Sequence, residues 1–190
     1  MIVVFVFCLA LVVSGGTTQD RSPRIAVGPN ILVSKDHPEF FHGELWFTAD
    51  PGHAERLMGG SMAYDVAKDI SYSIAYVSVD GGITWQSTLK TGESVDPACA
   101  YGPDGTAYFL HLDRMPGGGM EIYRSKDGGK TWLPPVLEMY LDREYMVVDN
   151  TPGKFRGRIY LNAHASGKNE PRGRVPTVFY SADGGDHFSD

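Results

Sequence analysis

One eight-residue phrase occurs three times in this chain and constrains the fold more than any other feature. The copies read SVDGGITW from Ser78, SKDGGKTW from Ser125 and SADGGDHF from Ser181, so they begin 47 and then 56 residues apart. A repeat of roughly 40 to 50 residues is the span of one blade of a β-propeller. The phrase therefore predicts a chain built of repeated supersecondary units.

Each copy is predicted to form a tight hairpin turn. A short carboxylate accepts hydrogen bonds from the backbone N–H groups that follow it, and the two glycines adopt positive φ without steric cost. The aromatic residue at the eighth place begins the returning strand and buries its ring against the neighbouring sheet. A structural rather than a catalytic role is therefore expected for these residues: Ser78, Asp80, Gly82, Trp85, Ser125, Asp127, Gly129, Trp132, Ser181, Asp183, Gly185 and Phe188.

A second pattern has the same spacing. Glu44, Asp96 and Glu144 each precede a short apolar strand, and three further strand-like segments follow in each unit. The sequence thus predicts four-stranded antiparallel blades. The expected divisions are a signal peptide at 1–16, a leader at 17–43 whose strand could close the ring, blades at 44–95 and 96–143, and a truncated third blade at 144–190.

Composition agrees with an all-β protein. The chain has 23 glycines and 12% aromatic residues, and no long segment keeps the apolar period of a helix. The net charge of −6 and the scattered lysines and arginines argue against nucleic-acid binding. The six histidines show no tight ligand spacing, so no metal site and no cofactor are predicted. Calcium held by backbone carbonyls would leave no sequence signature and stays open.

The start of the chain resembles an export signal. Residues 2–13 form an apolar run that is too short to span a bilayer, and small residues follow it up to Gly16. The prediction is cleavage near Gly16, a secreted or periplasmic protein, and no stable membrane span after processing; the alternative is a buried strand. Cys99 is then the one cysteine left, and we expect it to be a small buried hydrophobe.

Chain length limits the number of blades. About 174 residues remain after the signal and accommodate about three blades, whereas closed propellers have about 4 to 8. The ring is therefore expected to be incomplete in this chain. The sequence would then be the amino-terminal part of a longer protein, with the remaining blades in its carboxy-terminal part.

The repeated phrase resembles the Asp box, Ser-x-Asp-x-Gly-x-Thr-Trp, of bacterial neuraminidase repeats and sialidase-like β-propellers. The first two copies match at every specified place, and the third differs at His187 and Phe188, where looser packing is expected. The resemblance covers about residues 27–190 and implies a sialidase-like β-propeller. Such a fold hosts many functions, so activity must be argued from a site.

Blade topology places the expected site at the mouth opposite the Asp boxes. The strand starts Glu44, Asp96 and Glu144 would line it, together with loops at 63–72 and 113–119. His42, Arg143 and a third loop at 165–176 would join them, and the three loops carry Tyr64, Asp65, Asp69, Asp113, Arg114, Arg172 and Arg174. The structural alternative is that the three acids accept backbone hydrogen bonds and hold neighbouring blades together.

The resemblance also suggests roles for single residues. A sialidase needs an acid/base carboxyl, for which Asp65 and Asp69 are candidates, and arginines that bind the substrate carboxylate bidentately. Its tyrosine nucleophile would come from a late blade, beyond this chain. The candidate substrate-binding residues are Arg24, Glu44, Asp96, Arg114, Arg143 and Glu144.

Three functional classes follow from these residues. The first is a secreted exo-α-sialidase or related glycoside hydrolase that acts on glycans. The second is a non-catalytic Asp-box propeller that binds a glycan or a protein partner. The third is a propeller hydrolase of neutral polysaccharides that uses paired carboxylates from different blades.

Overall fold

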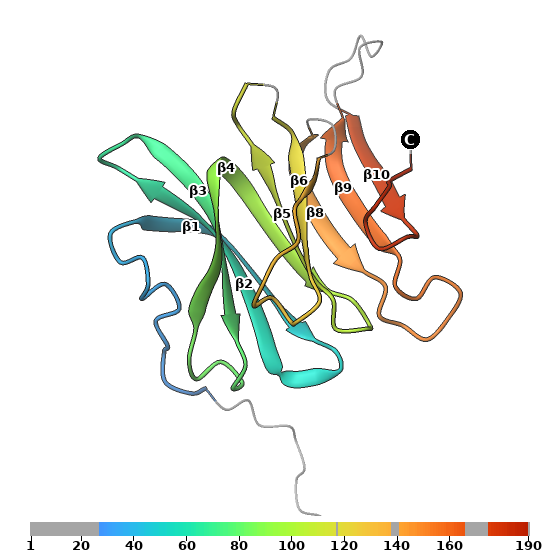
Figure 1. Cartoon of the computed structure of the whole chain (residues 1–190), viewed down its shortest axis with the longest axis horizontal. Helices are drawn as coiled ribbons and strands as arrows, with labels where there is room; N and C mark the ends of the chain where they lie inside the picture. Colours follow the sequence, from blue (N-terminus) through green and yellow to red (C-terminus); the bar gives the residue numbers. More distant parts are fainter. Residues whose placement is uncertain (1–26, 117, 138–140, 166–174, 190) are drawn as a thin grey trace, which may run out of the picture. The chain divides into compact units, whose positions relative to one another are not determined.

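The fold is formed by antiparallel strands joined by short turns (Figure 1). The structure is a computed structural model and describes residues 27–116, 118–137, 141–165 and 175–189. The expected signal peptide and Arg24, Arg172 and Arg174 lie outside these ranges. Residues up to Asn30 belong to a separate unit, so the description concerns Ile31 onward.

The described residues form strands and no α-helix. The strands are β1 (Phe41–Asp50), β2 (His53–Asp65), β3 (Ile70–Ser78), β4 (Gln86–Tyr101), β5 (Ala107–Asp113), β6 (Met120–Ser125), β7 (Val136–Leu137), β8 (Leu141–Val148), β9 (Ile159–Ala165) and β10 (Val175–Ser181). Every strand pair is antiparallel. The prediction of an all-β antiparallel fold is confirmed. Within the described ranges no helix is long and apolar enough to cross a membrane.

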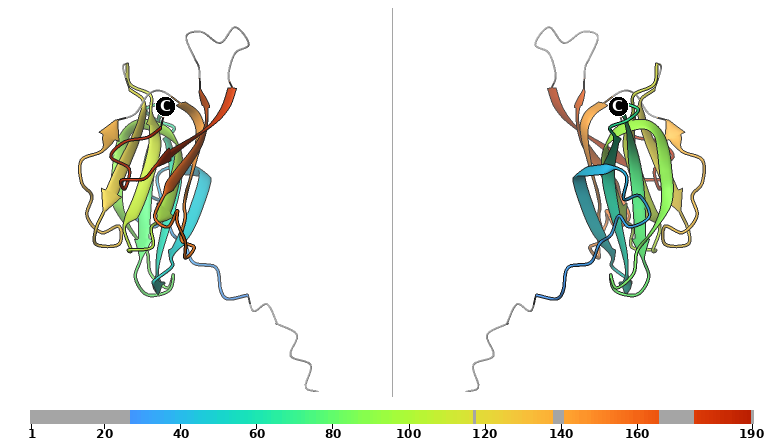
Figure 2. Two further views of the ribbon diagram at one scale, coloured as in Figure 1. Left: turned by 90° about the vertical axis from the view of Figure 1, so that its right-hand side faces the viewer. Right: turned by 90° about the vertical axis from the view of Figure 1, so that its left-hand side faces the viewer.

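Strand β4 is shared by two groups of strands. Its first half, Gln86–Glu93, pairs with β3, and its second half, Ser94–Tyr101, pairs with β5. The first strand group therefore comprises β1, β2, β3 and the first half of β4. The second comprises the rest of β4 with β5, β6 and β7, and the third comprises β8, β9 and β10. Figure 2 shows these strands running between two ends at which the turns and loops gather.

The three Asp-box turns have the same hydrogen-bond pattern. In the first, the Ser78 hydroxyl donates to Asp80 at 2.8 Å and accepts from the N–H of Gly82 at 2.9 Å. The N–H and hydroxyl of Thr84 both donate to the Asp80 carboxylate, which lowers the pKa of Asp80 to about 2. The second and third turns repeat these bonds from Ser125 and Ser181. Each copy of the phrase therefore forms the predicted tight turn, which its own serine and aspartate side chains stabilise.

The divergent third copy keeps this pattern through a different side chain. His187 stands where the other copies have threonine, and its Nδ1 lies 2.8 Å from Oδ2 of Asp183. Phe188 is partly buried against a hydrophobic cluster, whereas Trp85 of the first copy is 6% exposed. Histidine thus replaces threonine as the partner of the aspartate.

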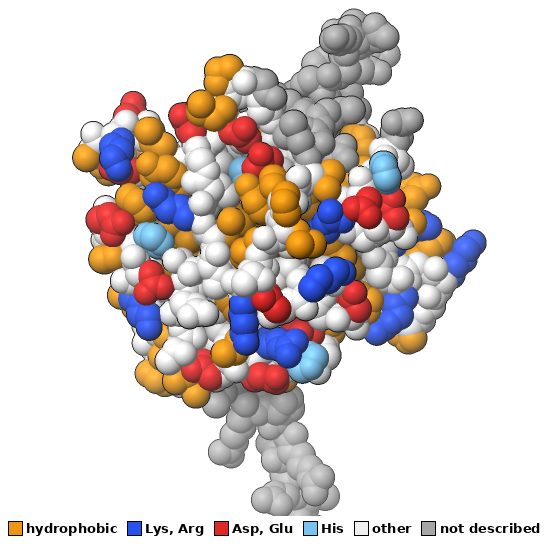
Figure 3. All heavy atoms as spheres, viewed as in Figure 1, with side chains coloured by type: hydrophobic (Ala, Val, Ile, Leu, Met, Phe, Trp, Pro, Cys, Tyr) orange, Lys and Arg blue, Asp and Glu red, His pale blue; other side chains and the backbone are white. Residues whose placement is uncertain are grey.

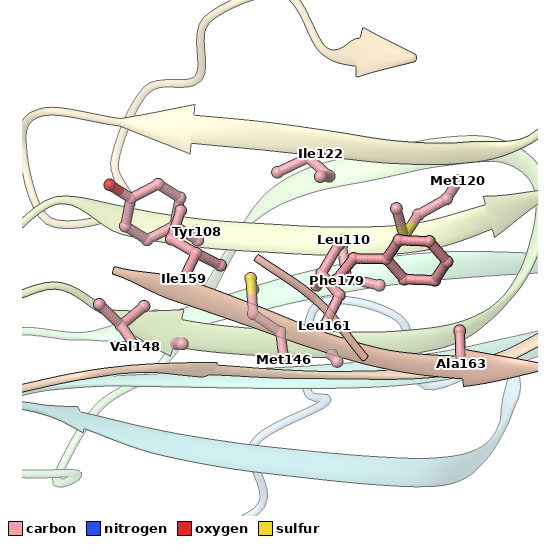
Figure 4. Packing of buried hydrophobic residues seen from close by; sticks show 12 residues of the cluster. Tyr108, Leu110, Met120, Ile122, Met146, Val148, Ile159, Leu161, Ala163 and Phe179 are labelled. Atoms are coloured by element: carbon pink, nitrogen blue, oxygen red, sulfur yellow. The ribbon is translucent and has the colours of Figure 1, made fainter. Parts of the chain in front are cut away.

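Two hydrophobic clusters join neighbouring strand groups. Phe109, Met58 and the buried Cys99 belong to the cluster between the first and second groups. The cluster between the second and third groups is drawn in Figure 4, where side chains from β5, β6, β8, β9 and β10 point toward one another. Its members are Ala98, Ala100, Tyr108, Leu110, Met120, Ile122, Met146, Val148, Ile159, Leu161, Ala163 and Phe179. Burial of these faces holds successive groups side by side.

Gly129 of the second Asp box has no room for a side chain. Its φ is +95°, and a Cβ there would lie 2.9 Å from Cγ2 of Val77. We expect Gly129→Ala to lower the free energy of unfolding by about 1–3 kcal/mol, because alanine is strained at this φ and would displace a buried valine. Urea unfolding followed by tryptophan fluorescence measures this change. Gly153→Ala is the control, since a Cβ at Gly153 meets nothing within 4 Å; equal effects of the two substitutions would contradict the prediction.

Candidate functional site

Strands β1, β4 and β8 lie side by side, and we call them the inner strands. Strand β4 contacts both β1 and β8. At the end of β4, the Tyr101 hydroxyl donates to the carbonyl of Gly128 in the second Asp box at 2.9 Å. The second Asp-box turn therefore lies at the end of β4. Glu44, Asp96 and Glu144 lie inside these strands, which corrects the prediction that each acid precedes its strand.

A pocket of about 250 Å³ lies beside the first part of β1 and β8 and the middle of β4. We call it the inner-strand pocket, and it is lined by Glu44, Leu45, Trp46, Asp96, Pro97, Glu144 and Tyr145. The structure thus brings together Glu44, Asp96 and Glu144, which are separated by about 50 residues in sequence. These are three of the six residues for which substrate binding was predicted.

Each inner strand has a one-residue bulge at this place, which decides where the acids point. The pairing register shifts between Gly43 and Trp46, between Val95 and Ala98, and between Asp142 and Tyr145. Glu44 and Asp96 are the first residues inside their bulges and have positive φ of 50° and 52°. Such φ values are uncommon for residues other than glycine, although asparagine, aspartate and histidine adopt them more often than the rest.

Glu144 is the second residue inside its bulge and not the first. It therefore occupies the place that Leu45 and Pro97 hold in the other two strands. The sequence pattern treated Glu44, Asp96 and Glu144 as equivalent, and the register corrects this by one residue in the third copy. Since successive residues of a strand point to opposite faces, one step turns the Glu144 side chain toward the interior.

Glu144 is a buried carboxyl group without a protein partner. Its side chain belongs to a residue that is 3% exposed, and neither carboxyl oxygen has a hydrogen-bond partner among the described residues. Burial, together with the charges of Asp96 and Glu44, raises the pKa of Glu144 to about 8. At neutral pH the group is therefore mostly protonated and can donate a hydrogen bond.

Two aromatic rings complete the pocket, and the sequence reasoning missed both. The ring centroids of Trp46 and Tyr145 are 5.5 Å apart, and the planes are tilted by 46°. Trp46 is half-buried and Tyr145 is 43% exposed. In the structure, both rings belong to the first residue after a bulge. The sequence contained a usable signal for this position. An aromatic residue just past an acidic strand start was visible in the first and third copies.

Asp65 and Asp69 lie in the β2–β3 turn and do not line the inner-strand pocket. Asp65 accepts the N–H groups of Ala67 and Lys68 and forms an ion pair with the Lys68 ammonium at 3.0 Å. The hydrogen bond from the Lys68 side chain lowers the pKa of Asp65. Asp69 accepts a hydrogen bond from the hydroxyl of Tyr64. Both aspartates thus organise this turn, and the turn alone explains their contacts.

The predicted arginines are not gathered at the pocket. Arg114 is exposed in the loop after β5, where its N–H donates to the carbonyl of Glu93 at 3.0 Å. The side chain of Arg143 lies outside the described part of the chain, as Arg24 does. None of the seven described lining residues is a lysine or an arginine. On the face shown in Figure 3, basic and acidic side chains are interspersed.

His42 was expected at the mouth with the three acids, but it does not line the inner-strand pocket. Its Nδ1 lies 3.0 Å from the Ser61 hydroxyl, and its Nε2 lies 3.1 Å from the carbonyl of His37. It lines a separate, mainly apolar cavity of about 320 Å³ that also contains Tyr76. Among the residues that the structure describes, no group of three or more His, Cys, Asp and Glu side chains has the geometry to hold a metal ion.

Comparisons with known proteins agree with this architecture. Residues 76–87 match the BNR/Asp-box repeat. Among solved structures, a protein of unknown function from Dyadobacter fermentans is similar over 80% of this chain and 54% of its own, with 19% identity and a TM-score of 0.59. This chain thus spans about half the length of that protein.

Two GH74 enzymes match more weakly. They are the GH74 xyloglucanase of Xanthomonas campestris, with 16% identity and a TM-score of 0.48, and a GH74 enzyme of Niastella koreensis, with 17% identity and a TM-score of 0.47. Each match covers 75% of this chain and 22% of the enzyme. The comparison with curated proteins returned no match. The chain is therefore similar at residues 76–87 to the BNR/Asp-box repeat, and its all-β fold is similar to that of the Dyadobacter fermentans protein.

Proposed function

We propose that this protein binds a glycan in the inner-strand pocket. The observation that supports the proposal is the meeting of three acidic side chains and an aromatic pair in one pocket, each contributed by strands far apart in sequence. The faces of Trp46 and Tyr145 can cover the apolar C–H face of a pyranose ring. Carboxyl groups beside them accept hydrogen bonds from sugar hydroxyls, and a protonated Glu144 can donate one.

Glycoside hydrolysis is a second candidate that a specific observation favours. A carboxylic acid that keeps its proton at neutral pH beside other carboxyl groups is the arrangement that glycosidases use for general acid catalysis. Glu144 would be the proton donor, and the burial of its carboxyl supports that role. Exo-α-sialidase activity is a narrower form of this candidate.

The proposal includes a larger ring and export. The strand groups would be successive blades, at 44–95, 96–143 and 144–190, of a sialidase-like propeller. Apolar side chains exposed on β1, such as Phe41 and Phe47, and on the third strand group, such as Val147 and Val178, support further blades beside them. The apolar run at 2–13 supports secretion or transfer to the periplasm.

Trp46→Ala is expected to weaken glycan binding about tenfold or more, because it removes one of the two faces on which the sugar ring lies. An array of neutral, amino and sialylated oligosaccharides, followed by calorimetry on the best ligand, measures the effect. Trp46 also packs on a core cluster, so Tyr145→Ala, at a more exposed ring, serves as the second variant. Phe155→Ala is the control, since Phe155 is an exposed ring outside the pocket. Absence of glycan binding, or binding that survives both pocket substitutions, would refute the proposal.

A further inference from the structure

Asp96 has a backbone conformation that glycine adopts more easily than aspartate. Its φ is 52°, at the first position of the bulge in β4. Eight described glycines have positive φ, and the described residues of other types that share it are Glu44, Asp69 and Asp96. In one kind of β-bulge the first residue has positive φ and is usually glycine, because glycine has no Cβ to clash. A contribution from the side chain would explain why position 96 is not glycine.

Contacts within the protein explain the aspartate at position 69 but not the one at position 96. Asp69 lies in the β2–β3 turn, where its carboxyl group accepts a hydrogen bond from the Tyr64 hydroxyl. The carboxyl group of Asp96 makes no hydrogen bond and no ion pair with the residues that the structure describes. It is half-buried and lines the inner-strand pocket. The role of the Asp96 side chain is therefore to be sought in this pocket.

Glu144 gives independent evidence for a ligand at the same place. The residue is 3% exposed, and neither of its carboxyl oxygens has a hydrogen-bond partner within the described ranges. Burial raises the pKa of Glu144 most and the charge of Asp96 raises it further, so the two carboxyl groups lie within electrostatic range of each other. Buried polar groups normally have a hydrogen-bond partner. A ligand in the inner-strand pocket can supply the one that Glu144 lacks.

The two carboxyl groups and the two aromatic rings of the pocket fit a sugar ring. An ionised carboxyl group has two acceptor oxygens, so Asp96 can bind two adjacent hydroxyl groups at once. A protonated carboxyl group such as that of Glu144 can donate as well as accept. The rings of Trp46 and Tyr145 offer faces for the C–H side of the sugar. These contacts depend on hydrogen-bond geometry and require no net charge in the pocket.

We propose that Asp96 is a ligand-binding residue that holds a sugar ring through two adjacent hydroxyl groups, and that its side chain is retained at a cost in stability. This inference rests on the proposed glycan-binding function and names the hydroxyl pattern by which the pocket selects its ligand. Removal of the side chain then lowers affinity without lowering stability. A purely structural role predicts the opposite, because removal of the side chain would destabilise the fold and leave affinity unchanged.

Four neutral tetrasaccharides test the ligand contact: cellotetraose, maltotetraose, mannotetraose and xylotetraose. Each presents adjacent hydroxyl groups on the second and third ring carbons. Calorimetry with the full chain identifies the tightest binder, which is then compared with its counterpart that lacks the hydroxyl groups on the second carbon. The expected result is about tenfold weaker binding of the deoxy ligand, because one hydrogen bond to a charged group is lost.

Asp96→Asn tests whether the same carboxyl group makes that contact. Asparagine has nearly the same size and also tolerates positive φ, but it has one acceptor oxygen in place of two. The substitution is expected to weaken binding of the parent tetrasaccharide about tenfold. It should add little to the loss already seen with the deoxy ligand, since both changes remove the same interaction.

Asp96→Gly separates binding from stability. It is expected to weaken binding of the parent tetrasaccharide about tenfold or more. The midpoint of urea unfolding should stay unchanged or rise, because glycine adopts the φ of this position without strain. Asp69→Gly is the matched control, since it makes the same change at a similar φ outside the pocket and should leave glycan binding unchanged.

Three results would overturn the inference while leaving the proposed function intact. They are equal binding of the parent and deoxy ligands, undiminished binding by Asp96→Asn, and a lower urea midpoint for Asp96→Gly. Failure of all four tetrasaccharides, when another glycan does bind, would also overturn it. Absence of binding to any glycan would overturn the proposed function as well.

Discussion

Glu144→Gln is expected to make the protein more stable at about pH 8 and to leave its stability below about pH 4.5 nearly unchanged. The pKa of Glu144 is about 8 in the folded protein, against an ordinary value of 4.5. Between these values the unfolded chain ionises this carboxyl while the folded protein keeps it protonated. Folding must then take up a proton, so the stability contributed by the group is complete below pH 4.5 and is lost as the pH rises toward 8.

The size of this loss is about 3–5 kcal/mol, since each pKa unit corresponds to about 1.4 kcal/mol. Glutamine carries no ionisable proton, so the substitution removes this part of the pH dependence. Urea unfolding at a series of pH values from about 4 to 9 measures it, with Glu55→Gln as the exposed control. A Glu144→Gln protein that loses stability with pH as steeply as the unsubstituted one would disprove the buried, protonated state of Glu144.

Phe109→Ala is expected to lower the free energy of unfolding by about 3–5 kcal/mol. The ring of Phe109 is fully buried between the first and second strand groups, and it lies edge-on to Trp132 with ring centroids 6.1 Å apart. Its side chain also fills the space above Gly60, where a Cβ would lie only 3.2 Å from the ring. Neighbours on both sides are held by strand pairing, so the cavity left by alanine cannot close easily.

Equilibrium unfolding in urea, followed by the fluorescence of the three tryptophans, measures this loss. Phe41→Ala makes the same chemical change at a ring that is 71% exposed and should cost less than about 0.5 kcal/mol. Similar losses for the two substitutions would contradict the placement of the core between the strand groups.

Much of the fold was predictable because its signals are local. The hydrogen bonds made by the serine and aspartate side chains within an Asp-box turn connect residues no more than four apart, such as Ser78 with Gly82, so a short phrase suffices to encode them. The same locality explains why His187 could replace threonine without loss of the turn. The continuous strand β4 was not predicted, since the sequence pattern places a blade boundary between residues 95 and 96 and does not show that one strand crosses it.

The candidate site was only partly predictable. The acidic residues Glu44, Asp96 and Glu144 were identified, and the structure brings them into one pocket. Trp46 and Tyr145 were missed because an aromatic residue in an apolar strand is usually a core side chain, and their place just after an acidic residue in the first and third copies was not used. Asp65 and Asp69 were selected for their loop position, and the structure shows that contacts within their own turn occupy both.

The amino-acid sequence by itself determined the repeat, the three Asp-box turns and the antiparallel all-β architecture, because each depends on residues close together along the chain. Only the tertiary structure decided which acid is buried. Glu144 and its counterparts differ by one position within a bulge, and strand pairing sets that position through contacts with β9. Successive side chains of a strand point to opposite faces. The difference of one position therefore places the carboxyl group of Glu144 in the interior, at the inner-strand pocket.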